Sequence, residues 1–114
     1  MLRKRNISLI IGFLCLQCLC AFAEPENGVQ REFYPNGKVR LESVFKKGRV
    51  VRSRTFYENG RLQSEFCYTP GALQRSRTFY SNGVLRSEWS RKAGTLRLYN
   101  MMGVLTNEAQ IKDY

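Results

Sequence analysis

The stretch RSRTFYENG at residues 52–60 is the strongest indication of the fold, because it returns with a single change as RSRTFYSNG at residues 75–83. A shorter copy of the same pattern ends in Asn36-Gly37, which is 23 residues before Asn59-Gly60. One further glycine stands between successive copies and keeps the same spacing, at Gly48, Gly71 and Gly94. Several residue types that recur together at one period indicate a tandem array of structural units.

Each 23-residue unit is predicted to form two short β-strands. Glycines recur every eleven or twelve residues and separate segments rich in Val, Phe, Tyr, Thr and Leu, a pattern typical of strands joined by tight turns. The first turn of each unit carries Asn-Gly, in which both residues accept the positive φ of a tight hairpin. The predicted turn residues are Asn36, Gly37, Asn59, Gly60, Asn82 and Gly83. The predicted fold class is therefore all-β, an elongated antiparallel meander of tandem hairpin repeats.

Alternation after each Asn-Gly predicts one apolar face for each strand that follows it. The apolar positions are Val39, Leu41 and Phe45, then Leu62, Phe66 and Tyr68, then Leu85 and Trp89. The recurrent Glu42, Glu65 and Glu88 are expected on the opposite face, and Trp89 is expected in the core. Such an array is stabilised between neighbouring units and leaves an open strand edge at each end.

The first 23 residues are predicted to be a cleaved signal peptide. A basic segment at 3–5 is followed by an apolar run at 7–20 and by the small residues Ala21 and Ala23 at the expected cleavage site. The alternatives are a retained membrane anchor, for which the run is short, and a lipid-modified cysteine. The predicted organisation is a signal peptide at 1–23, a polar lead-in at 24–30, the repeat array at 31–110 and a tail at 111–114. The mature chain is then exported, to the periplasm, the cell surface or the medium.

Removal of this leader leaves sixteen Lys and Arg against nine Asp and Glu, and one of the four cysteines, Cys67. An exported domain with one cysteine has no internal disulfide. We interpret Cys67 as a half-buried strand residue, with a cross-link between two chains as the alternative. The excess positive charge favours an anionic partner such as lipid headgroups, an envelope polymer or an acidic protein.

Two sets of side chains are candidates for binding that partner. Arginines two residues apart on a strand share a face, so the repeated stretch predicts a basic stripe across the sheet. Its residues are Arg52, Arg54, Arg75 and Arg77. The alternative is that these arginines pair with the recurrent glutamates as exposed ion-pair rungs, each of small value. The second set is the aromatic row of Tyr34, Tyr57 and Tyr80, for which packing beside the turns is the alternative role.

Catalytic chemistry is not predicted. The chain has no histidine, and its glutamates recur at matching repeat positions instead of converging on one site. Its glycines stand singly at turns and form no phosphate-binding loop. We therefore expect no enzyme activity, no cofactor, no metal site and no small-molecule substrate. Nucleic acid is disfavoured by the predicted export, and the open strand edges allow an oligomer.

The pattern [Phe/Tyr]-Tyr-x-Asn-Gly-x-[Leu/Val]-x-x-Glu resembles the MORN-variant repeat of bacterial proteins grouped as YwqK-type antitoxins. The likeness covers residues 31–110, and its fourth copy is degenerate, with Asn100 and Met102 in place of Tyr and Asn. The resemblance implies a hairpin ladder that binds proteins or membrane lipids, and the antitoxin grouping implies inhibition of a cognate toxin. Our functional prediction is an exported, non-enzymatic repeat module that binds a protein or an anionic envelope or membrane component through a basic sheet face. The alternative is an antitoxin or immunity protein.

Overall fold

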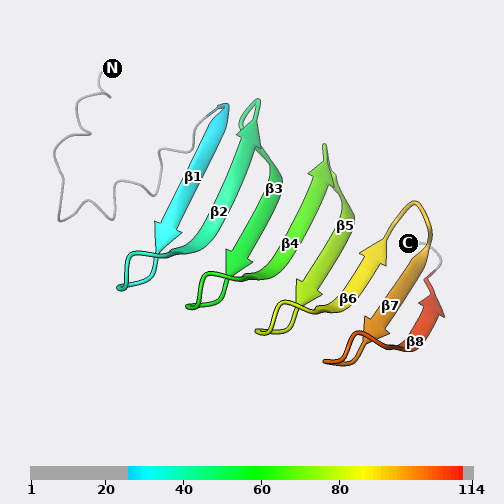
Figure 1. Ribbon diagram of the computed structural model, residues 1–114. Coiled ribbons are helices and arrows are strands. Elements are labelled where there is room, and N and C mark those ends of the chain that lie inside the picture. The colour runs from blue at the N-terminus through cyan, green and yellow to red at the C-terminus, as the bar shows by residue number, and fades with distance from the viewer. Residues whose placement is uncertain (1–25, 112–114) are drawn as a thin grey trace, which may run out of the picture.

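The computed structural model describes residues 26–111, which form one antiparallel sheet of eight strands in chain order (Figure 1). The strands are β1 (Gly28–Phe33), β2 (Val39–Lys46), β3 (Arg49–Phe56), β4 (Leu62–Thr69), β5 (Ala72–Phe79), β6 (Leu85–Ser90), β7 (Thr95–Tyr99) and β8 (Leu105–Gln110). The predicted all-β meander is confirmed. The predicted signal peptide lies outside the described residues, and among those residues no helix is long and apolar enough to cross a membrane.

The sheet is a single layer. Its overall dimensions are 52 × 33 × 16 Å, and neither a helix nor a second sheet covers its faces in Figure 1. Phe45 is the only hydrophobic residue of the described part that is buried, and the polar Ser64 and Glu65 are buried with it. Trp89 stays half-buried, contrary to our expectation of a core residue, because no second layer packs against it. Contacts between neighbouring strands therefore stabilise the array.

Each Tyr-x-Asn-Gly sequence forms a hairpin loop closed by its tyrosine. In the first loop, the backbone N–H of Tyr34 donates to Lys38 O at 2.8 Å, and the N–H of Gly37 donates to Tyr34 O at 2.9 Å. Only the glycine has a positive φ, of 88°, as in a type I turn that ends on a left-handed residue. Asn36 does not share the positive φ that we predicted. Its Oδ1 instead accepts a hydrogen bond from the N–H of Lys38 at 2.9 Å.

A β-bulge follows each of these turns and divides the predicted apolar face. Phe33 stands opposite Val39, whereas Glu32 stands opposite Leu41, so Arg40 is an extra residue in β2. Because neighbouring residues of β1 point to opposite faces, Val39 and Leu41 also occupy opposite faces. The prediction that they share one face is wrong for this reason. The same shift recurs at the start of β4 and of β6.

The degenerate fourth copy still forms a turn. Gly103 has a φ of 86°, and the N–H of Asn100 donates to Val104 O at 2.9 Å. Asn100 occupies the tyrosine position, and its Oδ1 accepts hydrogen bonds from the N–H groups of Met102 and Val104 at 2.8 and 3.0 Å. β8 follows this turn and is exposed along its whole length.

Candidate functional site

One residue from every strand forms a row that crosses the whole sheet and alternates arginine with glutamate. In strand order, the row consists of Arg31, Glu42, Arg54, Glu65, Arg77, Glu88, Arg97 and Glu108, each opposite the next. We call this row the Arg–Glu ladder and the side of the sheet that carries it the ladder face. Arginines separate its carboxylates, and no three His, Cys, Asp or Glu side chains of residues 26–111 gather as metal ligands.

The centre of the ladder is a buried carboxylate held by two guanidinium groups. The Glu65 side chain is 6% exposed, with Arg54 Nε at 3.0 Å and Arg77 Nη2 at 2.5 Å from its oxygens. Arg54 also lies 3.5 Å from Glu42 and so bridges two carboxylates. Burial raises the pKa of Glu65, but the hydrogen bonds from Arg77 and Arg54 together outweigh it and lower the pKa below its usual value. Glu65 is therefore a charged structural group.

Two arginines of the predicted basic stripe are neutralised within the ladder. Arg54 and Arg77 both take part in ion pairs, as the ion-pair alternative expected, although the carboxylate they share is buried. The guanidinium of Arg77 also lies 5.8 Å from the centre of the Phe79 ring. At the other end of the ladder, Arg97 Nε donates to Glu108 at 2.7 Å, which raises the pKa of that guanidinium.

The other two arginines of the stripe are Arg52 and Arg75. They lie on the ladder face in the row of facing residues next to the Arg–Glu ladder, with Cys67 between them. Arg75 Nη2 lies 3.9 Å from Cys67 Sγ, and Cys67 is half-buried, as expected. Within the described residues, neither arginine has a carboxylate within 4.0 Å, and Arg52 Nε is buried without a hydrogen-bond acceptor.

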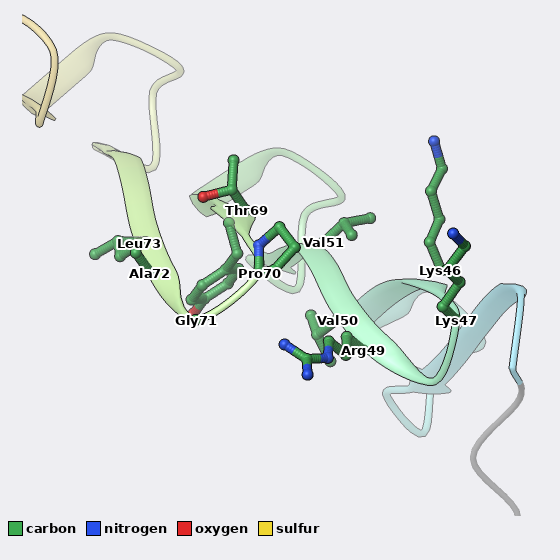
Figure 2. Close-up of a pocket in the computed structure, with 11 residues that line it drawn as sticks. Lys46, Lys47, Arg49, Val50, Val51, Thr69, Pro70, Gly71, Ala72 and Leu73 are labelled. Atoms are coloured by element: carbon green, nitrogen blue, oxygen red, sulfur yellow. The ribbon is translucent and has the colours of Figure 1, made fainter.

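A groove opens where β3 and β4 cease to pair. The last facing pair is Arg52 and Cys67, and beyond it the tips of two hairpins enclose an open space of about 730 Å³ (Figure 2). Its lining includes the apolar side chains Val50, Val51, Tyr68, Pro70 and Leu73. Its basic residues, Lys46, Lys47 and Arg49, all belong to the β2–β3 hairpin. We did not predict this groove, although three bases around Gly48 were a visible signal.

The three motif tyrosines tie each turn to the next unit. The hydroxyl groups of Tyr34, Tyr57 and Tyr80 donate to the carbonyl oxygens of Phe56, Phe79 and Tyr99 at 2.5, 2.7 and 2.8 Å. The motif asparagines add a longer bond, such as that from Asn36 Nδ2 to Glu58 O at 3.3 Å. These polar atoms are used inside the array, which matches the structural role that we gave as the alternative for the tyrosines.

The repeat units coincide with a known family. The MORN repeat variant matches the chain at residues 26–47, 49–69 and 75–93. Each match contains one Tyr-x-Asn-Gly turn; the first two include both strands of the hairpin, and the third begins within β5. Comparisons with curated proteins and with solved structures each found no match. Repeats of this kind are consistent with a module that binds proteins or membranes, and the antitoxin grouping stays a prediction. The chain belongs to the MORN repeat variant family.

Proposed function

We propose that the chain is an exported, non-enzymatic binding module that docks an anionic partner through one basic region of its sheet. The region consists of Lys46, Lys47, Arg49, Arg52 and Arg75, and we call it the basic region. The partner is an acidic protein surface or an anionic component of the envelope or membrane. Export is supported by the basic, apolar and small-residue pattern of residues 1–23. The absence of histidine and of converging acid–base groups in the sequence supports a role without catalysis.

The observation that carries the proposal is the lack of charge compensation in the basic region. The ion pairs of the described residues involve Glu32, Glu42, Glu65 and Glu108, and none of them includes a base of this region. Four carboxylates are therefore neutralised by the ladder and by the pair between Arg40 and Glu32, whereas Glu26, Glu58 and Glu88 take part in no ion pair within residues 26–111. Uncompensated charges that lie close together create a positive potential that attracts anions.

The groove gives the basic region an apolar component. Arg52 directly follows Val51 in β3, so this arginine adjoins the lining of the groove. Arg75 faces Cys67 and Leu73 faces Tyr68, so a bulge at Gln74 puts Arg75 on the opposite face from Leu73. Binding interfaces combine an apolar centre with a polar rim, and arginine is enriched in them. A partner that carries acidic groups next to apolar side chains or acyl chains would match both parts.

The proposal is tested by reversing two charges in the basic region and two outside it. The test variant combines Arg52→Glu with Arg75→Glu. The control combines Lys38→Glu with Arg61→Glu, which changes the net charge equally at the Asn-Gly turns. Binding is measured by co-sedimentation with phosphatidylcholine vesicles, with and without phosphatidylglycerol, and by pull-down from an envelope fraction, each at low and raised salt.

We expect the test variant to bind at least about tenfold more weakly, since each base near an anionic surface contributes on the order of 1 kcal/mol. Raised salt should weaken binding of the unmodified protein. The control should keep most of its binding. Equal loss in both variants would show that net charge alone attracts the partner, and unchanged binding in the test variant would contradict the proposal. The antitoxin alternative has a separate test. Co-expression of this chain must restore growth to cells that produce a toxin encoded by an adjacent reading frame.

A further inference from the structure

The two ends of the sheet carry complementary halves of the Arg–Glu ladder. We propose that copies of the chain associate head to tail, with β8 of one copy pairing with β1 of the next, so that the ladder continues across the junction. The partner is therefore a second copy of this chain. The residues involved lie outside the basic region, so the inference does not depend on the proposed function.

The end strands offer free sides for such pairing. In the described sheet, β1 pairs only with β2 and β8 pairs only with β7, and they lie at opposite ends of the array in Figure 1. Every residue of β8 is exposed, and Gln30 is the only residue of β1 that is not. Strand edges with unpaired backbone groups are ready templates for another strand.

Strand direction favours the pairing of β8 with β1. Successive strands alternate in direction, so a strand beside β8 in the same meander would run in the direction of β1, β3, β5 and β7. The β1 strand of a second copy can therefore follow β8 as β3 follows β2. The pairing of unlike ends repeats at every junction and gives an open chain of copies instead of a closed dimer.

Charge selects the register and excludes the pairing of like ends. Arg54, inside the ladder, has carboxylates on both sides, at 3.5 and 3.0 Å. Arg31 has one ladder partner and is 48% exposed, and Glu108 also has one and is 40% exposed. Placing Arg31 opposite Glu108 gives each its second partner. Pairing β1 with β1 or β8 with β8 around these residues would bring like charges together, which destabilises a sheet.

The neighbouring positions are compatible with this register. With Arg31 opposite Glu108, antiparallel pairing puts Gln30 opposite Ala109 and Glu32 opposite Asn107, so no like charges face each other. Phe33 and Leu105 are 56% and 46% exposed. Both lie on the ladder face in a row of apolar residues at the bulges, where Phe33 faces Val39 and Leu105 faces Tyr99. The junction would cover part of both side chains.

The junction should be weaker than the contacts between units of one chain. Inside the array, each motif tyrosine donates a hydrogen bond to the next unit, as Tyr34 does to Phe56 O. The last turn has Asn100 at that position, and its side chain is used within its own turn. A junction without this bond predicts association that is reversible and depends on concentration.

The test uses protein purified from cells that express the full chain, in unmodified form and as the variants Glu108→Arg and Arg31→Glu. Light scattering after size exclusion follows the mass as concentration rises. Each variant alone presents like charges at the junction, Arg against Arg or Glu against Glu. In an equal mixture of the two variants, every mixed junction again pairs Arg with Glu. Circular dichroism checks that each variant keeps its sheet.

We expect the unmodified protein to grow beyond a dimer with concentration. Each variant alone should associate at least about tenfold more weakly, and the mixture should recover most of the loss. A second measurement needs no variant: hydrogen exchange in β1 and β8 should slow with concentration, whereas exchange in β4 should not. A monomer at every concentration, a mixture that stays dissociated, or end-strand exchange that does not depend on concentration would each overturn the proposal.

Discussion

The hydroxyl of Tyr57 donates a 2.7 Å hydrogen bond to the carbonyl oxygen of Phe79, which lies 22 residues further along the chain. The bond begins in the turn between β3 and β4 and ends on β5, so it joins one unit to the next. The same bond links the turns that contain Tyr34 and Tyr80 to their following units. In a sheet with one buried hydrophobic residue among those described, such bonds between units take much of the role of a core.

Removing this hydroxyl should destabilise the array. We expect Tyr57→Phe to lower the free energy of unfolding by about 1 kcal/mol, because it leaves a part-buried carbonyl without its donor. The control is Tyr68→Phe, since the Tyr68 hydroxyl has no hydrogen-bond partner among the described residues. Urea denaturation compares the two variants. Equal losses in both would show that the bond to Phe79 contributes nothing specific.

The glycine of the motif turn should not tolerate a side chain. Gly60 has a φ of 92°, and a left-handed conformation costs most other residues roughly 1–2 kcal/mol. We therefore expect Gly60→Ala to reduce stability by about that amount in thermal or urea unfolding. Lys47 has a φ of 54°, so Lys47→Gly should cause no loss. A larger loss of stability in Lys47→Gly than in Gly60→Ala would contradict this explanation of the turns.

Breaking the centre of the Arg–Glu ladder should cost more than breaking its end. Glu65→Gln removes the charge that two arginines share in a buried position, and we expect a loss of about 2 kcal/mol. Glu108→Gln affects one exposed ion pair and should cost less than about 1 kcal/mol. Chemical denaturation of both variants measures the difference. Similar small losses would indicate that the ladder is only a set of surface pairs.

The lowered pKa of Glu65 predicts a loss of stability in acid. A carboxyl group whose pKa is lower in the folded state contributes its full stabilisation above its usual pKa, here 4.5, and loses it as the pH falls through the lowered value. Between about pH 6 and pH 3, the unmodified protein should therefore lose more stability than Glu65→Gln does. Parallel pH profiles of the two proteins would contradict this role of Glu65.

Much of the fold could be predicted because the relevant signals are local. A glycine in a short turn between two β-rich segments specifies a hairpin wherever it occurs, and a constant period requires successive hairpins to be alike. The basic region was predicted only in part. Arg52 and Arg54 are two residues apart in the same repeated stretch, yet Arg54 has two carboxylates near it and Arg52 has none within 4.0 Å among the described residues. Which arginine faces a glutamate depends on the partner strand.

The period, the positions of the turns and the strand order could be read from the residues alone, since these follow from backbone preferences within a few residues. The face that each side chain occupies depends on how the strands pair, which the three-dimensional fold sets. The bulge at Arg40 arises because β2 has one more residue than β1 in the paired stretch. The sequence of either strand alone does not reveal this extra residue. The same pairing buried Glu65 between Arg54 and Arg77, where the ion-pair alternative had exposed rungs, and it left Arg52 and Arg75 without a carboxylate within 4.0 Å among residues 26–111.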